Sequence, residues 1–191
     1  MPKSPSRDYA ARLEIDYPDK LNRLTTFFRP ILVIPIAIIV SLLSTGLWFA
    51  TLLMIVFRVK YPRWWFDFAR ELARLNTRVG AYAALLTDVY PSTTKDQAVH
   101  LEVDYPDVSK DLNRWMPLVK WLLAIPHYVI LAILWLFAFV AIVVAWFAIL
   151  ITGRYPRGLF NYVVGLFRWS LRVSAYMYLL VTDQYPPFGM G

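Results

Sequence analysis

The sequence predicts an all-α membrane protein of two tandem, pseudo-symmetric helical hairpins, with about four membrane helices in total and short β-strands and interfacial helices before each hairpin. Three observations predict this fold class. Hydrophobic residues make up 59% of the chain, against roughly 45 to 50% in an ordinary soluble domain. Two stretches, 36–57 and 127–152, hold no Asp, Glu, Lys or Arg, and each exceeds the ~20 residues that a helix needs to cross a bilayer core. The second half of the chain also repeats the pattern of the first.

The two halves match at a nearly constant offset. The segment 112–114 repeats 21–23 at an offset of 91 residues, and Arg168 repeats Arg74 at an offset of 94. Both halves therefore present the same elements in the same order. We expect a first repeat over residues 1–97 and a second over 98–191.

In the first repeat, polar and apolar residues alternate over 12–17, which predicts a short half-exposed strand. The segment 21–34 mixes basic and apolar side chains, as an interfacial helix does, and Pro35 predicts a kink or restart after it. A membrane helix over 36–57 follows. Residues 64–86 place their charged side chains on one helix face. We expect this amphipathic helix to span with its polar face turned into the protein, although a helix lying flat in the interface shows the same pattern.

The second repeat follows the same order. It predicts a strand over 99–105, an interfacial helix over 112–125, a membrane helix over 127–152 and an arginine-bearing membrane helix over 158–181. An even number of spans in each repeat places both strands on one side of the membrane, where they can pair with each other. Basic residues are more numerous before the spans than in the turns after them, which favours cytoplasmic termini.

Arginines inside these apolar helices need an explanation, because an arginine at the centre of a membrane helix costs ~2.5 to 3.5 kcal/mol on insertion scales. One hypothesis is that the arginine faces bind lipid headgroups, an anion or a partner helix. The candidate residues are Arg74, Arg78, Arg154, Arg157, Arg168 and Arg172. The alternative is that they pair with acids or with carbonyl groups inside the protein. The candidate pairing acids are Asp67, Glu71, Asp88 and Asp183.

The sequence predicts no catalytic residues, no metal site and no cofactor. It holds no cysteine, which excludes disulfides and thiol nucleophiles. Its two histidines, His100 and His127, have no partner at a metal-ligand spacing. The formal charge of +7 suits basic residues beside membrane spans and anionic lipid, so we expect membrane lipids as partners and no nucleic acid.

Several runs in the second half resemble the bacterial domain of unknown function 4389 family. They are Trp121–His127, Gly153–Phe160, Arg168-Trp169, Arg172-Val173, Tyr176, Leu179-Leu180 and Thr182–Phe188. The first half is similar to a diverged copy, since it keeps Tyr61-Pro62-Arg63 and Arg78-Val79 but has Trp64-Trp65-Phe66 in place of Gly158-Leu159-Phe160. The resemblance implies a small multi-pass protein of the bacterial inner (plasma) membrane with repeated hairpins. It implies no activity and no catalytic residues.

Three hypotheses about function follow. The first is a non-catalytic integral membrane module, an accessory or scaffold subunit of a membrane protein complex or a self-associating protein, that binds lipid headgroups or partner helices through its arginine faces. The second is a homo-oligomeric channel or transporter with an anion-selective path. The third is an interfacial lipid-modifying enzyme.

Overall fold

The fold, seen in a computed structural model, is described for residues 9–58, 60–93, 97–106 and 112–191. Helices make up most of it, and two short strands form a small sheet. The elements in chain order are β1 (Ala11–Ile15), α1 (Arg23–Arg58), α2 (Arg63–Ala83), β2 (Val99–Val103), α4 (Met116–Leu123), α5 (Ile125–Thr152) and α6 (Arg157–Met177).

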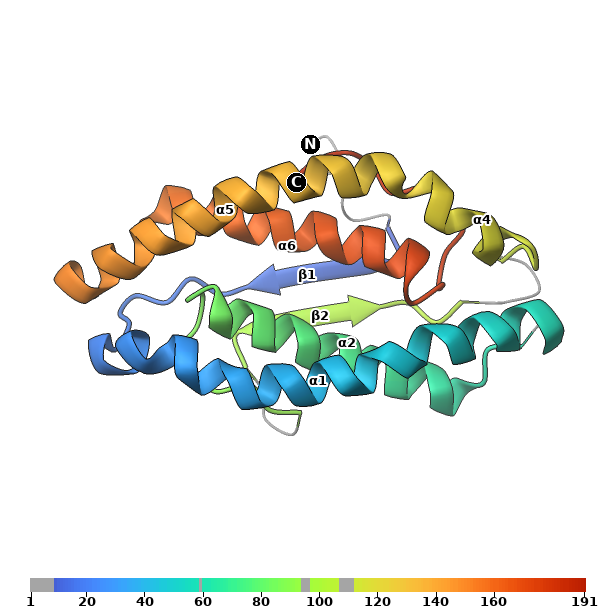
Figure 1. Ribbon diagram of the computed structural model, residues 1–191, viewed down its shortest axis with the longest axis horizontal. Coiled ribbons are helices and arrows are strands. Elements are labelled where there is room, and N and C mark those ends of the chain that lie inside the picture. Colours follow the sequence, from blue (N-terminus) through green and yellow to red (C-terminus); the bar gives the residue numbers. More distant parts are fainter. Residues whose placement is uncertain (1–8, 59, 94–96, 107–111) are drawn as a thin grey trace, which may run out of the picture.

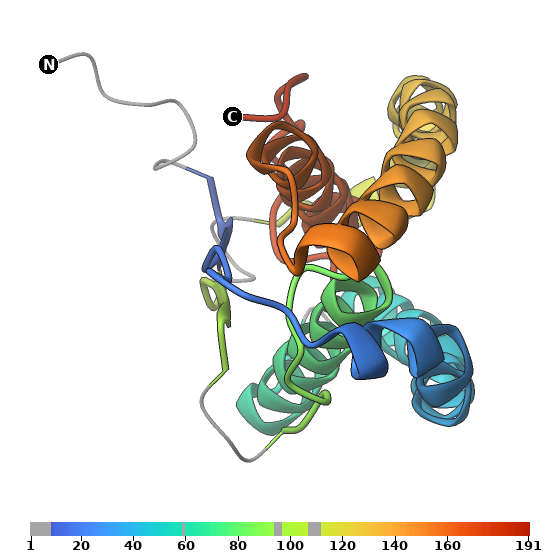
Figure 2. The same ribbon diagram turned by 90° about the vertical axis from the view of Figure 1, so that its left-hand side faces the viewer.

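The elements form three layers that share one long axis. Figure 1 shows the strands and the long helices all running along that axis, and Figure 2 looks along it. The sheet lies on one side, α2 and α6 form the middle layer, and α1 and α5 lie on the side opposite the sheet. Contacts agree with this order, since the strands touch α2 and α6, and α1 and α5 touch α2 and α6 from the other side.

The sheet is an antiparallel pair in which Leu13 lies opposite Leu101. The predicted pairing of the two strands is thereby confirmed. Every second residue of each strand is buried against the helices, and the residues between them are exposed except for the partly buried Arg12, as the alternation in the sequence indicates. The strands stop before Tyr17 and Tyr105, which the predicted ranges included. Tyr17 instead donates a hydrogen bond of 2.5 Å to the Tyr155 carbonyl, and Tyr105 donates one of 2.7 Å to the Tyr61 carbonyl.

Each strand packs on a helix from the other repeat. β1, from the first half of the chain, contacts α6, and β2, from the second half, contacts α2. The two halves therefore exchange strands, and the buried core contains both.

The long helix of the first half differs from the predicted ranges. The interfacial helix expected over 21–34 and the membrane helix expected over 36–57 are one continuous helix, α1, with Pro30 and Pro35 inside it. Pro30 has no N–H to bond the Thr26 carbonyl, and that carbonyl instead accepts a hydrogen bond of 3.1 Å from Trp146 Nε1. In the second half, α4 and α5 are separate helices that meet at Ala124.

The amphipathic helices α2 and α6 end earlier than predicted, at Ala83 and Met177. Beyond each end a leucine has left-handed backbone geometry, Leu85 with φ 66° and Leu180 with φ 57°. That conformation is unfavourable for a residue with a Cβ atom and turns the chain away from the helix axis.

Two helices, α1 and α5, are long and apolar enough to cross a membrane by length and composition. Only 11% of the apolar window of α1 and 17% of that of α5 is buried, whereas the core helix of a soluble protein would be mostly covered. This exposure supports membrane association. Within the described ranges α2 and α6 do not meet the same criterion, because each carries a charged face.

Candidate functional site

Two buried basic side chains fasten the helical layers together. Arg29 of α1 is 0% exposed; its Nη1 donates to the Thr87 carbonyl at 3.1 Å and its Nη2 pairs with Asp88. The guanidinium carbon lies 4.7 Å from the centre of the Tyr82 ring. A planar guanidinium with these three partners fixes the chain after α2 against α1.

The second repeat contains a matching arrangement around Lys120 of α4. Its Nζ lies 2.7 Å from Asp183 Oδ1 and 2.7 Å from the Thr182 carbonyl, and 5.0 Å from the centre of the Tyr176 ring. Burial lowers the pKa of Lys120, while the hydrogen bond that Lys120 donates to Asp183 acts in the opposite direction. Arg29 and Lys120 were not among the predicted site residues, although they occupy equivalent positions in the two repeats, 91 residues apart.

The four candidate acids all pair with basic side chains of the protein. Asp88 and Asp183 pair with the buried basic residues above, and each also accepts the backbone N–H of an asparagine, Asn22 or Asn113. In α2, Asp67 lies 3.4 Å from Arg70, and Glu71 lies 2.9 Å from Arg74. Asp88 and Asp183 therefore bind the segments that follow α2 and α6 to neighbouring elements, and Asp67 and Glu71 form ion pairs on the surface of α2 itself.

The arginines in the middle of α2 and α6 point towards the sheet. Arg74 donates to the Leu101 carbonyl of β2 at 3.3 Å, and Arg168 donates to the Leu13 carbonyl of β1 at 3.0 Å. These equivalent arginines thus bind equivalent strand carbonyls, and in each case the strand belongs to the other repeat.

The next arginine along each helix binds backbone carbonyls of the segment that passes over it. Arg78 donates to the Ser92 carbonyl. Arg172 donates to the carbonyls of Gly189 and Gly191. Both side chains are buried, Arg78 at 6% and Arg172 at 4% exposure, so these contacts lie inside the protein.

Of the remaining candidates, Arg154 lies in the turn between α5 and α6 and Arg157 is the first residue of α6, and both are exposed. The Arg157 guanidinium carbon lies 4.5 Å from the centre of the Tyr17 ring. At the other end of the molecule Arg63 makes the same contact with Tyr105 at 4.7 Å. The structure therefore does not bring the six predicted arginines together in one site.

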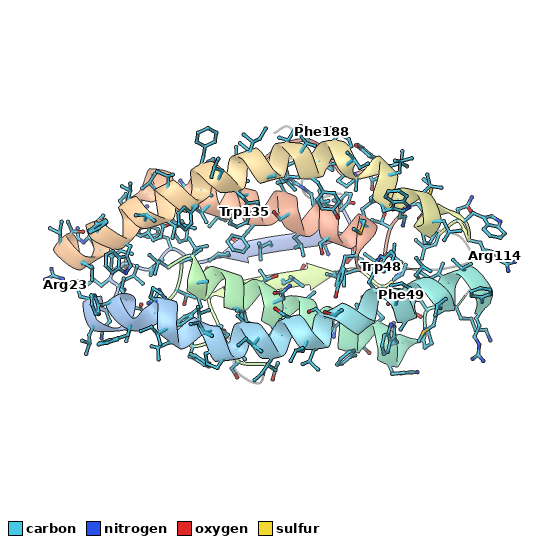
Figure 3. The ribbon with its side chains drawn as sticks, viewed as in Figure 1. Arg23, Trp48, Phe49, Arg114, Trp135 and Phe188 are labelled. Carbon is cyan, nitrogen blue, oxygen red and sulfur yellow. The ribbon has the colours of Figure 1, made fainter. Side chains whose placement is uncertain are left out.

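Apolar and charged surfaces lie on opposite sides of the molecule. The α1 and α5 layer exposes large apolar side chains along its whole length: Leu24, Phe28, Ile31, Leu42, Phe49 and Phe57 on α1, and Val129, Ile133, Leu136, Phe139, Val140 and Phe147 on α5. The outer face of the sheet presents Arg12, Glu14, Asp16, His100, Glu102 and Asp104. Figure 3 shows further basic residues at the two ends of the long axis, with Arg23 at one end and Arg114 at the other.

A cavity of about 720 Å³ lies between α1, α2, α5 and α6. Its lining is mostly apolar and includes no Asp, Glu, Lys, Arg or His side chain. Figure 3 shows Trp135, one of the lining residues, on the side of α5 that faces α6. Sequence reasoning did not predict this cavity, because its walls come from both repeats.

His127 is buried among aromatic side chains. Trp169 Nε1 donates to its Nδ1 at 3.1 Å, and its ring stacks on Phe188 with centroids 4.1 Å apart. Within the part of the chain that the structure describes, no three His, Asp or Glu side chains come together as metal ligands would.

Comparison with known proteins identifies the family and no individual relative. Residues 23–95 and 114–189 each match the domain of unknown function DUF4389. Searches of curated proteins and of solved structures gave no significant match. The two matched regions cover most of the chain and follow one another in tandem, as the repeat in the sequence indicates. The chain therefore belongs to the DUF4389 family and carries two copies of its domain.

Proposed function

We propose that this protein is a non-catalytic membrane module, an accessory or scaffold subunit that sits in one leaflet of the bilayer through the exposed face of α1 and α5. The observation that carries the proposal is the separation of surfaces: an uninterrupted apolar face on one side and the charged sheet face on the other. Helices that lie in a membrane surface show this separation, with their apolar faces ~5–10 Å inside the bilayer.

The direction of the strands favours an orientation in which α1 and α5 lie in the plane of the membrane over one in which they cross it. The strands run beside the helices along the same axis. If α1 and α5 crossed the bilayer, the sheet would lie at membrane depth with the charged side chains of Glu14, Glu102 and Asp104 pointing outwards. Each charged group at the centre of a bilayer costs ~2.5 to 3.5 kcal/mol on insertion scales. With α1 and α5 lying along the leaflet, the same groups stay in water.

The hydroxyl groups on the apolar face of α1 suit contact with lipid. Ser41 and Thr45 are exposed, and each donates to a carbonyl of its own helix, at 2.7 and 2.9 Å. Their donors are therefore satisfied without water. The only charged residue between Leu24 and Phe57 is Arg29, which is fully buried in the protein.

Headgroup binding is assigned to the exposed basic residues at the two ends. Arg23 and Arg154 lie at one end, and Arg58, Arg63 and Arg114 at the other. With a net charge of +7, these residues favour the anionic cytoplasmic leaflet of a bacterial plasma membrane, which would place both termini in the cytoplasm. The arginines of α2 and α6 bind backbone carbonyls within the protein, which argues against an anion-selective path along those helix faces.

Single cysteines test the orientation, because the natural chain has none. Lys20→Cys and Lys60→Cys place a thiol beyond each end of α1, at exposed positions. We expect a membrane-impermeant maleimide to label both from the cytoplasmic side, in inside-out vesicles, together with Glu14→Cys on the sheet. Leu42→Cys, on the apolar face, should react only after detergent is added.

Labelling of Lys20→Cys and Lys60→Cys from opposite sides would overturn the proposal and favour the multi-pass arrangement with spanning hairpins. Labelling of Leu42→Cys in intact vesicles would show that the α1 face is not in lipid. Crosslinking in native membranes then tests the accessory role, since a scaffold subunit should yield a reproducible adduct with another membrane protein or with itself.

A further inference from the structure

We infer that the cavity between α1, α2, α5 and α6 is a binding site for one acyl tail of a phospholipid from the surrounding leaflet. The inference rests on the proposed position of α1 and α5 in the membrane. The volume of the cavity, about 720 Å³, falls in the range of ~300–1,000 Å³ that is typical of small-molecule sites.

Two walls of the cavity carry side chains of different size. α2 contributes small residues, among them Ala69, Ala73 and Ala83. Trp135 and Trp146 of α5 line it from the opposite repeat. Small residues on one wall leave the space open, and broad aromatic surfaces on the other offer dispersion contacts to a hydrocarbon chain.

Several of the larger polar side chains in the lining are bonded within the protein. Trp135 Nε1 donates to Ser170 Oγ at 3.1 Å, Thr77 donates to the Ala73 carbonyl at 2.9 Å, and Tyr178 donates to the Ser44 carbonyl. These bonded groups offer few partners to water, most of the other lining side chains are apolar, and apolar cavities take up apolar ligands.

The cavity opens on the membrane face. Phe139 and Val143 line it and are also 65% and 39% exposed on the outer surface of α5, so the lining continues into the apolar face. The two outer helices touch near one end, where Trp146 donates to the Thr26 carbonyl. Near the other end of α1, Arg114, which precedes α4, donates to the Val56 carbonyl at 2.7 Å. Figure 1 shows the middle of α5 arching away from α1 between these contacts.

The absence of charge in the lining decides which lipid source fits. A free fatty acid would bring its carboxylate to a wall with no basic partner, at the cost of burying an unpaired charge. A phospholipid tail enters as hydrocarbon alone, and its headgroup stays at the level of the exposed basic residues. We therefore assign the site to a phospholipid tail.

Native mass spectrometry of the full chain tests the assignment. The protein is reconstituted in palmitoyl-oleoyl phosphatidylglycerol, extracted in mild detergent and compared with two cavity-filling variants, Ala73→Phe in the wall and Ala83→Phe at an exposed position of the lining. Ala132→Phe, on the exposed surface of α5 outside the lining, is the matched control. We expect one phospholipid to remain on the wild type and on Ala132→Phe. Retention should fall roughly tenfold or more in both cavity variants, because the ring takes the space of the tail.

Flotation with the same vesicles separates this inference from the proposed function. All three variants should float like the wild type, since their apolar faces are intact. Equal lipid retention in Ala83→Phe and wild type would overturn the cavity site while leaving the membrane position standing. Failure of the wild type to float would overturn both. Displacement of the retained phospholipid by equimolar oleate would replace the assigned source with a free fatty acid.

Discussion

Replacing Lys120 with methionine tests whether the buried ion pairs hold the helical layers together. The ammonium group is buried and touches two oxygens, Asp183 Oδ1 and the Thr182 carbonyl, both at 2.7 Å. Lys120→Met keeps most of the side-chain volume but leaves the Asp183 carboxylate without its cation. Removing one member of a buried pair costs ~3–5 kcal/mol. The Asp183 side chain is 21% exposed, so we expect the lower end, about 3 kcal/mol.

A double-mutant cycle isolates the pair. Lys120→Met with Asp183→Asn removes both charges, and replacing a buried pair by uncharged groups is often close to neutral. The coupling free energy between the two positions should reach about 2 to 3 kcal/mol. The assay is urea unfolding in detergent micelles followed by circular dichroism, with midpoints and slopes compared across the four proteins.

Two comparisons sharpen the result. Arg12→Met breaks the exposed pairs with Glu102 and Asp104 on the sheet, and exposed pairs contribute at most ~1 kcal/mol. Arg29→Met tests the equivalent pair in the first repeat and should resemble Lys120→Met. If Lys120→Met destabilises no more than Arg12→Met, or if the two substitutions in the cycle are additive, the buried ion pair does not hold the helical layers together.

Two further predictions concern single groups. A Cβ atom on Gly165 would lie 2.7 Å from Met190 Cβ and 3.1 Å from the Met190 carbonyl oxygen, so Gly165→Ala should displace residues 189–191 from Arg172. Carboxypeptidase should then remove these residues faster than in the wild type. Equal rates of removal would contradict the prediction. Burial raises the pKa of Tyr61 and Tyr155 above the ordinary value of 10.0. The contribution of each neutral, buried tyrosine to the free energy of unfolding is therefore complete below pH 10 and falls above pH 10 by about 1.4 kcal/mol per pH unit. Urea midpoints between about pH 9 and pH 12 should therefore fall less steeply in Tyr155→Phe, and an unchanged slope would show that Tyr155 ionises freely in the folded protein.

The order of elements could be read from the sequence because periodicity and charge depend on local residues. The alternation around Leu13 and Leu101 predicted two strands, and the repeat of the pattern in the second half predicted their duplication. The continuity of α1 could not be predicted in this way. Pro30 removes a hydrogen bond from the Thr26 carbonyl, and the replacement donor, Trp146, lies 120 residues away.

The partners of the charged residues were also hidden in the sequence. Asp88 and Asp183 were candidate partners for the arginines of the amphipathic helices, and they pair instead with Arg29 and Lys120. A helical spacing shows which residues share a face and says nothing of which segment covers that face. The exchange of strands could not be predicted for the same reason. The sequence of β1 would be the same whether the strand packed on the helix of its own repeat or on that of the other repeat.

The strand carbonyls explain why arginines stand in the middle of α2 and α6. Asp104 donates its N–H to the Ala10 carbonyl and Asp16 donates to the Ala98 carbonyl, both at 2.9 Å. Hydrogen-bonded and non-hydrogen-bonded pairs alternate along an antiparallel ladder, so Leu13 and Leu101 form a non-hydrogen-bonded pair whose carbonyls point outwards, to the two open edges. In a two-stranded sheet these carbonyls have no neighbouring strand to bond them. Arg168 and Arg74 supply that donor, and since each arginine comes from the repeat that does not contain the strand, the same contact closes the sheet edge and joins the two repeats.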